Sequence, residues 1–430
     1  MPVFILRLLR IVRPPDQVPE EYRQTFLHFY MDMVWFGVLS GTAIAFLAVY
    51  ATRLGATNQE IGLLTAAPAL INLIFTLPVG DWLSRQSLGK SVFQNSIAQR
   101  LLYLTLILLP VFFVEKAQVW AIIILTLLTS IPGTIVVVGF NAFFGEIVPL
   151  EWRAYVVGIR NAALSVTASL FTLISGVILS RLAFPLGYQI VFAIGLVGAG
   201  MSSLHLYLLS RAARSRERSY PQVSQLKTQN GVRLSFEIRN LVERGKRQLR
   251  LDAMRGKFKK VMLLLFGWHF FQFCTIPIIT PFVIHGLHLS DQTIGFAQAL
   301  FSGLTFIGSL ILNRFTLRFG NKILTGGGIM ALGFFPILLS FSTTGYVIAN
   351  IIGGFAWAMA GGALYNYVLE NSPSSDLPAH LAWYNLIFNA GVLLGSFIGP
   401  SLASIIGYQP ALIILGIGRF LAGLAIVLFG

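Results

Sequence analysis

Long apolar runs alternate with short polar stretches along almost the whole chain. A helix of about 20 apolar residues is long enough to cross the hydrocarbon core of a bilayer. The runs are continuously apolar and do not alternate with polar residues, which favours membrane helices over the strands of a β-barrel. The pattern predicts twelve spans, at residues 27–51, 61–79, 94–114, 118–145, 154–180, 184–209, 261–285, 293–313, 322–341, 345–368, 381–405 and 409–430.

One long polar run, residues 211–260, divides these spans into two sets of six. It carries 15 Lys or Arg and four acids, so +11 of the chain's net charge of +15 lies there. We therefore predict a cytoplasmic tail at 1–26, a six-helix bundle at 27–210, a basic linker at 211–260 and a second six-helix bundle at 261–430.

Composition agrees with a protein whose main solvent is lipid. The chain is 56% hydrophobic and 11% charged, whereas soluble globular domains carry about 25% charged residues. A basic balance is also typical of nucleic-acid binding, but these cations lie between and beside apolar spans, which favours a role in membrane orientation. No nucleic-acid partner is therefore expected. The single cysteine, Cys274, excludes an intrachain disulfide.

Orientation follows from Lys and Arg, which accumulate on the cytoplasmic side of membrane proteins. With both termini inside, 27 of these residues lie on the inner side, and three, Arg53, Lys116 and Arg181, lie on the outer side. The distribution predicts an integral multi-pass protein of the plasma membrane or bacterial inner membrane, with both termini and the linker in the cytoplasm. Within the linker, residues 232–251 are expected to form an amphipathic helix on anionic lipid headgroups.

The two sets of spans resemble each other in sequence. Ile61-Gly62, at the start of the second span, matches Ile294-Gly295, at the start of the eighth, at an offset of 233 residues. At an offset of 224 residues the matching pairs are Glu146 and Glu370, Pro149 and Pro373, and Asn161 and Asn385. Parallel repeats of this kind are typical of transporters built from two similar bundles.

Three loop sequences carry a family resemblance. RFGNKILTG at 318–326 is similar to the Asp-Arg-x-Gly-Arg-Arg loop pattern of the major facilitator superfamily, with Leu317 in place of the acid. GDWLSRQSLGK at 80–90 is a looser match, and EIVPLEWRAYVVG at 146–158 resembles the family's loop after the fourth span. With twelve spans and a basic loop after the sixth, the chain resembles this superfamily over nearly its whole length. The resemblance implies an all-α membrane protein with twelve transmembrane helices in two pseudo-symmetric six-helix bundles.

Two features depart from the proton-antiport members of that superfamily. Those members often carry an Arg in the fourth span, and the span at 118–145 has none. Their Gly-x-x-x-Gly-Pro element lies in the fifth span, whereas here it lies in the eleventh, at Gly391, Gly395 and Gly399-Pro400. The resemblance therefore does not assign drug–proton antiport, and the glycine ladder is interpreted as a site of close helix packing.

The resemblance implies that the first, fourth, seventh and tenth helices line a central cavity. Independently, polar residues recur on one helical face of each of these spans, as expected of helices that face water, ligand or each other. We predict a substrate cavity whose lining and coupling residues are His28, Asp32, Trp35, Asn141, His269, Gln272, Asn350, Trp357 and Tyr365.

Asp32 is the acid that lies most clearly inside a span. A carboxylate is costly there, so the position suits either a site that loads and releases a proton, or a salt bridge or hydrogen bond near the cytoplasmic end. His28, one turn away, is a candidate partner. Both a proton carrier and a hydrogen-bonding cavity residue remain open for His269. Arg100 and Arg160 are interpreted as side chains that extend to the membrane interface.

Charged residues at the cytoplasmic ends of the spans form a second candidate set. In the superfamily, contacts between carboxylates and Arg at this level close the inner gate when the transporter faces outward. The resemblance therefore implies a cytoplasmic gate formed by Asp81, Arg85, Glu146, Arg153, Arg318 and Glu370. The alternative is that these are solvated loop charges.

These features predict a secondary active transporter that moves a small solute by alternating access, coupled to an ion or to H⁺. A lipid or hydrophobic-compound flippase or efflux protein of the same fold is the alternative, because 35 Phe residues allow a wide aromatic cavity. The sequence contains no GxxxxGK[ST] loop, so ATP-driven transport is not expected. It also contains no HExxH pair and no intramembrane carboxylate pair, so no enzyme activity, cofactor or metal site is expected. The expected partners are the solute and membrane lipids, and the expected state is a monomer.

Overall fold

The computed structural model describes residues 18–83, 85–219, 254–373 and 377–430. Within these ranges the chain is almost entirely helical and forms no strand. Twelve helical segments of the described residues are long and apolar enough to cross a membrane, as the hydrophobic pattern predicts. The amphipathic helix expected at 232–251 lies outside the described residues.

The N-terminal half supplies six spans. The first is built from three consecutive pieces, because a π-helical turn interrupts its α-helix. The elements are α2 (Glu20–Leu39), η1 (Ser40–Ile44), α3 (Ala45–Arg53), α4 (Asn58–Leu83), α5 (Leu88–Phe112), α6 (Glu115–Ile147), α7 (Leu150–Arg181) and α8 (Leu186–Ser219). Most predicted bounds of these spans lie within several residues of the observed ones, since the polar residues that end an apolar run also end its burial in lipid. The helices extend beyond the predicted spans at Glu20, seven residues before the first, and at Ser219, ten residues after the sixth.

The C-terminal half repeats the plan with one difference. Its elements are α10 (Gly256–Pro281), η5 (Phe282–Gly286), α11 (Asp291–Leu339), α12 (Thr343–Glu370), α13 (Leu377–Ile406) and α14 (Tyr408–Phe429). The spans predicted at 293–313 and 322–341 are joined in α11, which bends at Gly320. Gly320 has φ 78° and ψ 162°, a backbone conformation that residues other than Gly rarely adopt. The chain therefore turns at Gly320 without a separate loop.

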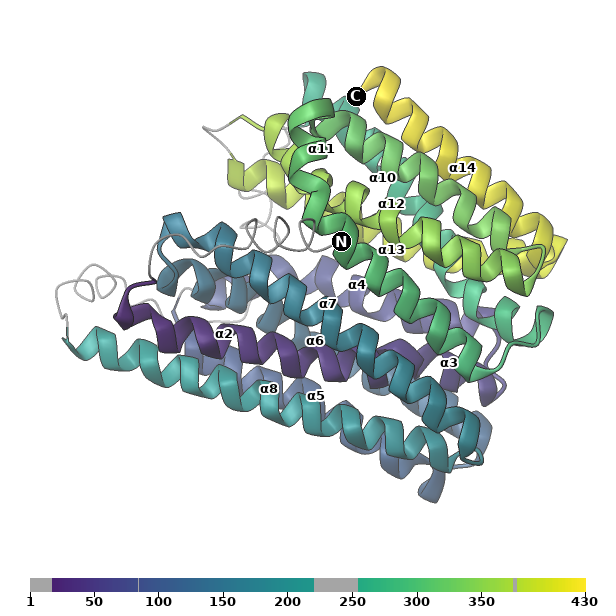
Figure 1. The fold of residues 1–430 in the computed structure, drawn as a ribbon, viewed down its shortest axis with the longest axis horizontal. Coiled ribbons are helices and arrows are strands. Elements are labelled where there is room, and N and C mark those ends of the chain that lie inside the picture. The colour runs from purple at the N-terminus through teal and green to yellow at the C-terminus, as the bar shows by residue number, and fades with distance from the viewer. Residues whose placement is uncertain (1–17, 84, 220–253, 374–376) are drawn as a thin grey trace, which may run out of the picture.

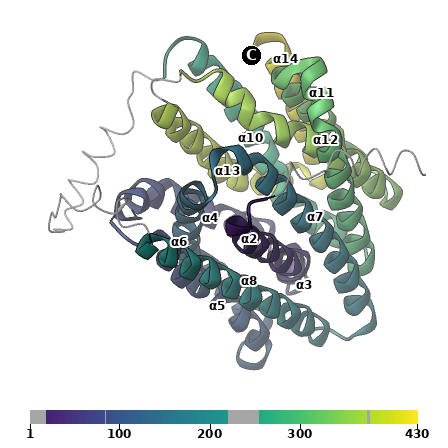
Figure 2. The same ribbon diagram turned by 60° about the vertical axis from the view of Figure 1, so that its left-hand side comes forward.

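The two halves lie side by side, with the N-terminal half in the lower part and the C-terminal half in the upper part of Figure 1. In Figure 2, α2 lies in the middle of its half, with other helices of that half around it. We call the end of the molecule that holds Glu20, Ser219, Gly256 and Phe429 the linker end. The opposite end, which holds Arg53 and the start of α11, is the far end.

The apolar core joins the halves toward the far end. One buried cluster contains Phe46 and Tyr50 of the N-terminal half together with Ile278, Phe282 and Ile294 of the C-terminal half. Toward the linker end, the halves have separate clusters. One contains Phe26, Phe29 and Leu209, and the other contains Leu265, Trp268 and Tyr367. The described residues therefore pack the two halves together at one end of the molecule and around separate centres at the other.

The repeated Ile-Gly pairs mark the places where helices of the two halves cross. A methyl group on Gly62 of α4 would overlap the Ser396 carbonyl of α13. A methyl group on Gly295 of α11 would lie 3.0 Å from the Thr172 carbonyl and 3.1 Å from Gly176 Cα, both on α7. Lipid provides no hydrophobic force between helices, so close backbone approach supplies the packing energy. The repeat seen in the sequence thus corresponds to two similar contacts between the halves.

The glycine ladder in α13 packs against α10. A side chain at Gly391, Gly395 or Gly399 would press on the backbone of the α10 residues from His269 to Cys274. The interpretation of this ladder as a close helix-packing site is confirmed. It joins two helices of the same half and does not connect the halves.

Candidate functional site

A network of buried polar groups surrounds Asp32 in the N-terminal half. Asp32, on α2, is 2% exposed, and its Oδ1 accepts a hydrogen bond of 2.5 Å from Ser202 Oγ on α8. Ser202 Oγ accepts in turn from Arg100 Nη2 on α5 at 2.8 Å. On the other side, Arg160 Nη2 of α7 lies 3.9 Å from Asp32 Oδ2. Three helices, α5, α7 and α8, thus place polar side chains around the Asp32 carboxylate of α2.

Arg100 and Arg160 do not extend to the membrane interface, so that prediction is wrong. They are 8% and 9% exposed, respectively. Arg100 Nη1 donates to the Ala199 carbonyl at 2.6 Å and also to Ser203 Oγ. Both guanidinium groups turn inward because the Asp32 carboxylate and the α8 hydroxyls offer them charge and acceptors that lipid cannot supply.

The hydrogen-bonding partner of His28 is His205 rather than Asp32. Nδ1 of His28 lies 3.1 Å from Nδ1 of His205 on α8, and the ring centroids are 5.3 Å apart. One nitrogen must donate and the other accept, so the pair holds one proton between these two atoms. His28 therefore lies beside the Asp32 network without belonging to it.

On α10, His269 and Gln272 carry buried polar atoms without a protein partner. His269 is 2% exposed and Gln272 is 8% exposed. Neither ring nitrogen of His269, nor Oε1 of Gln272, has a hydrogen-bond partner among the described residues. The His269 ring lies 4.4 Å from that of Trp268 and 4.9 Å from that of Phe388, and Trp268 lies 6.5 Å from Trp357 on α12. His269 and Trp357 thus flank the same tryptophan.

The other four predicted cavity residues differ in their surroundings. Asn350 is 3% exposed, and its Nδ2 donates to the Tyr346 carbonyl one turn earlier at 2.8 Å. Tyr365 is 52% exposed, Asn141 is exposed and Trp35 is half-buried. Among the described residues, none of these four side chains hydrogen-bonds to another predicted cavity residue.

Two of the predicted gate residues make contacts at the linker end within their own half. Arg153 Nε and Nη2 donate to the carbonyls of Val148 at 3.0 Å and Gly145 at 2.5 Å, which satisfies the C-terminal end of α6. Glu370 Oε1 accepts from Asn321 Nδ2 at 2.7 Å.

The other predicted gate residues lie at the same end. The Arg318 guanidinium lies 5.2 Å from the centre of the Phe319 ring. Arg85 and Glu146 are exposed. The side chain of Asp81 lies outside the described residues. The hydrogen bonds of Arg153 and Glu370 join the ends of neighbouring helices within one half and leave the inner gate a prediction.

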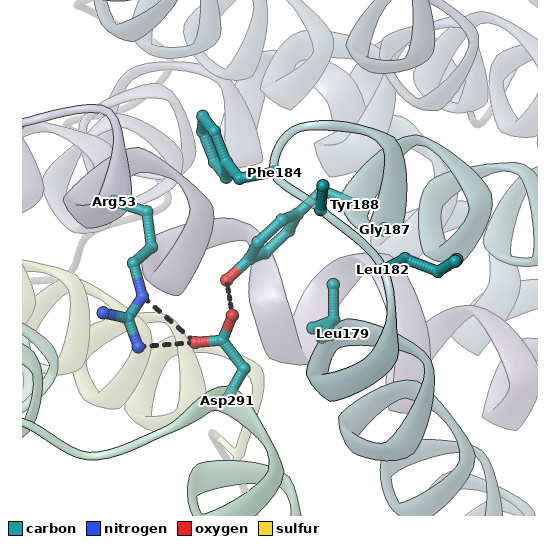
Figure 3. Close-up of a pocket in the computed structure, with 8 residues that line it drawn as sticks. Arg53, Leu179, Leu182, Phe184, Gly187, Tyr188 and Asp291 are labelled. Atoms are coloured by element: carbon teal, nitrogen blue, oxygen red, sulfur yellow. Dashed lines mark hydrogen bonds and ion pairs between the residues drawn. The ribbon is translucent and has the colours of Figure 1, made fainter.

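At the far end, an ion pair joins the two halves (Figure 3). Arg53, at the end of α3, donates from Nε and Nη2 to Asp291 Oδ1 at 3.1 and 2.8 Å, and from Nη2 to the Leu289 carbonyl at 2.8 Å. Tyr188 of α8 donates to Asp291 Oδ2 at 2.7 Å. Asp291 begins α11, where the helix dipole also favours a negative charge. One carboxylate thus binds two elements of the opposite half.

Further hydrogen bonds between the halves lie between the far end and the middle of the spans. They join Gln59 to Ser404 at 3.0 Å, Tyr408 to Asn58 at 2.7 Å, and Ser169 to the Ala299 carbonyl at 2.9 Å. A small cavity of about 170 Å³ lies beside the ion pair, and its other walls include Leu179, Leu182 and Phe184.

The sequence interpretation missed the pair of Arg53 and Asp291. The two residues are 238 positions apart, so neither helical periodicity nor loop motifs connect them. The available signal is their placement: each lies shortly before one of the repeated Ile-Gly pairs, with opposite charge. Two bundles related by this repeat bring both positions to the same end of the molecule.

An apolar groove of about 640 Å³ lies on the C-terminal half. Its walls come from α11 and α12 and include Leu304, Phe315, Phe319, Ile351, Phe355 and Met359. Its lining is suited to a hydrocarbon group. No group of three or more His, Cys, Asp or Glu that could hold a metal ion occurs in the described part of the chain.

Comparison with protein families gives a match over both halves. The family model described as Major Facilitator Superfamily matches residues 25–273 and 261–430. The two matches overlap at residues 261–273, and together they include nearly all of the chain.

Two curated proteins are similar to part of the chain. Multidrug resistance protein 1 of Bacillus subtilis (strain 168) is 26% identical over 132 residues, which are 30% of this chain and 34% of that protein. Solute carrier family 67 member A1 of Homo sapiens is 27% identical over 143 residues, which are 31% of this chain and 33% of that protein. The chain therefore spans about a third of the length of the curated relatives that it matches.

Solved structures share the fold over nearly the whole chain. The nucleoside transporter NupG has a TM-score of 0.64 at 13% identity, covering 95% of this chain and 98% of that one. The xylose transporter XylE from E. coli has a TM-score of 0.66 at 17% identity, covering 96% and 98%. A D-xylose-proton symporter has a TM-score of 0.68 at 18% identity, covering 94% and 97%.

The Asp32 network predicts that replacing Asp32 and replacing Arg160 reduce the stability of the protein unequally. Asp32→Asn leaves Arg100 and Arg160 without a carboxylate, and an uncompensated buried charge costs about 3–5 kcal/mol. Arg160→Gln leaves Asp32 balanced by Arg100 through Ser202, so its cost is expected to be smaller. Thermal unfolding of the purified variants in detergent measures the difference. Equal loss of stability in the two variants would contradict this description of the network.

Proposed function

Because the chain belongs to the major facilitator superfamily and is a transporter rather than an enzyme, we propose that it moves a small solute across a cell membrane by alternating access. The observation that carries the proposal is the contact between the halves. Hydrogen bonds, helix crossings and a shared apolar core join them toward the far end, whereas their cores toward the linker end are separate. Such a contact allows the halves to rock about the site between them.

The distribution of Lys and Arg supports a cytoplasmic position for the linker end. The inner side holds 27 of these residues, and Arg53, Lys116 and Arg181 lie on the other side. With this orientation the far end faces outward and the described conformation is closed to the outside. The ion pair of Arg53 and Asp291 then serves as an outer latch, which opens when the transporter faces outward.

We assign the coupling role to Asp32. Its carboxylate is almost completely buried, and its contact with Arg160 is longer than a hydrogen bond, so this side of the carboxylate is free to exchange partners. A proton bound at Asp32 would leave Arg100 and Arg160 without their carboxylate in the low-dielectric interior, and this uncompensated charge would favour movement of the halves.

Unpaired polar atoms support a solute site between the halves that includes His269 and Gln272. Their buried nitrogen and oxygen atoms have no partner among the described residues and can bind water or solute. Trp35, Asn141, Trp357 and Tyr365 extend the proposed lining. Asn350 is a weaker member, since its amide already donates to its own helix.

Proteoliposome transport tests the proposed function and the coupling together. Solutes including nucleosides, xylose and organic ions are offered with and without a pH gradient, and uptake and efflux are measured. The wild type is expected to accumulate at least one solute when the gradient is present. Asp32→Asn is expected to lose accumulation while it retains solute exchange, because exchange requires no net proton movement.

Two results would contradict these proposals separately. If no solute moves in any condition, the transport proposal fails. If Asp32→Asn protein, verified as folded by size-exclusion chromatography, accumulates solute like the wild type, the coupling role of Asp32 fails. Asp32→Glu is the matched variant, because it keeps an acid and is expected to retain gradient dependence.

We further propose that the linker-end charges close an inner gate in the outward-facing state. In this role Arg153 and Glu370 exchange their present contacts within one half for contacts between the halves. The other members of the proposed gate are Asp81, Arg85, Glu146 and Arg318. Charge reversal tests one direct pair. Arg318→Glu and Glu370→Arg are each expected to reduce transport, and the double variant is expected to recover it. A double variant as inactive as the single ones would exclude a direct contact of these two residues.

The apolar groove favours a second candidate function. A volume of about 640 Å³ lined by Leu, Ile, Phe and Met side chains suits a lipid tail or hydrophobic compound. Movement of a fluorescent phospholipid between leaflets of the same proteoliposomes distinguishes lipid flipping from transport of a water-soluble solute.

A further inference from the structure

Three arginines are buried inside the described spans, and they differ in what holds their guanidinium groups. Arg100 donates to Ser202, Ser203 and the Ala199 carbonyl. Arg419, on α14, is 2% exposed and donates to the backbone carbonyls of Gln272 at 3.0 Å and Leu332 at 3.4 Å. The helices around these two cations supply acceptors to their terminal Nη atoms.

Arg160 differs from the other two. It is 9% exposed, yet it makes no hydrogen bond to any residue that the structure describes, and its Nε, like that of Arg419, is buried and unpartnered. The nearest carboxylate oxygen, Asp32 Oδ2, lies 3.9 Å from Nη2, beyond hydrogen-bonding distance. A guanidinium group has five N–H donors, and leaving them unsatisfied in a buried site is costly. The Arg160 side chain can therefore donate hydrogen bonds to a ligand that carries oxygen atoms.

Aromatic rings hold the Arg160 guanidinium in place. Its Cζ lies 4.4 Å from the centre of the Phe140 ring, 5.6 Å from Phe29 and 5.5 Å from Phe144. Phe29 belongs to α2, whereas Phe140 and Phe144 belong to α6, so the group points from α7 toward the first and fourth spans. Cation–π contacts orient a cation without occupying its N–H donors. Phe140 and Phe144 are half-buried and offer an apolar surface to the rest of a ligand, whereas Phe29 is fully buried.

The charge balance indicates the sign of that ligand. Arg100 and Arg160 share the Asp32 carboxylate, which leaves this network with one excess positive charge. An excess charge in a low-dielectric interior is expensive, and a bound anion lowers that cost. A cationic ligand would increase it. The network therefore favours a ligand with a single negative charge.

We propose that Arg160 binds the carboxylate of a monoanionic organic solute with an aromatic or apolar body. The assignment rests on the proposed transport function and names its substrate class. The planar guanidinium pairs with a carboxylate through two parallel N–H···O bonds, a geometry that a lysine cannot supply. The carboxylate would satisfy the free donors of Arg160, and the half-buried rings of Phe140 and Phe144 would contact the organic body.

Matched probe pairs test the assignment on the full-length protein in detergent. Benzoate, 2-naphthoate and phenylacetate are compared with benzamide, 2-naphthamide and phenylacetamide, which keep the shape and lose the charge. Stabilisation against thermal unfolding reports binding as a function of probe concentration. At least one carboxylate is expected to bind the wild type more tightly than its amide.

Variants on a single helix separate the role of Arg160 from a general effect of charge. Arg160→Gln is expected to weaken carboxylate binding about 10- to 100-fold and to remove the preference over the amide. Arg160→Lys keeps the charge without the planar fork and is expected to bind at an intermediate affinity. Arg181→Gln, at the exposed far end of α7, is the matched control and is expected to bind like the wild type.

Two outcomes overturn the inference. The first is that no carboxylate binds the wild type more tightly than its amide. The second is that Arg160→Gln keeps the wild-type affinity and the preference for the carboxylate. If Arg160→Gln does not fold, Arg160→Lys is used for the second comparison. Binding is measured without a membrane or a gradient, so either outcome stands apart from the transport assay. Failure of every solute to move in proteoliposomes concerns the proposed function alone.

Discussion

Contact between the two halves toward their far ends is the constraint on which the rest of the structure depends. Glycines at matching positions, Gly62 and Gly295, let helices of opposite halves approach, and the ion pair of Arg53 with Asp291 joins the same end. Lipid does not drive helices together, so these specific contacts determine how the halves sit. With the halves joined here, their apolar cores remain separate toward the linker end.

The low dielectric of the membrane interior explains the second main feature. An isolated charge is expensive there, so Asp32, Arg100 and Arg160 lie together in the N-terminal half. The surrounding helices supply hydrogen-bond acceptors to the guanidinium group of Arg100, whereas Nε of Arg160 is buried without an acceptor. Residues that sequence patterns assign to the membrane interface thus form the polar centre of the bundle, and the unsatisfied cation becomes the candidate ligand contact.

Much of the fold was predictable from the sequence, because a bilayer imposes a minimum length and an apolar character on every span. The twelve spans follow from that constraint, and the matching motifs, such as Ile61-Gly62 and Ile294-Gly295, indicate the repeated halves. The merging of two spans at Gly320 was not predicted, because positive φ at one glycine leaves no pattern in the neighbouring residues. Asp32 was recognisable as an acid within a span, but its partners Ser202 and Arg160 lie 170 and 128 positions away, and only the packing of α2 against α8 and α7 brings them close.

The most direct test measures the distance between the far ends of the two halves. Spin labels are attached at Arg181→Cys and Phe341→Cys, two exposed positions in opposite halves, in a Cys274→Ser background. Pulsed electron paramagnetic resonance then measures the distance between the two labels. The account predicts one short distance in the parent protein and an added longer population in Asp291→Asn. Glu115→Gln, which changes an exposed acid at the same end, should leave the distance unchanged. An identical distance distribution in Asp291→Asn and the parent would contradict the proposal that Arg53 and Asp291 hold the halves together.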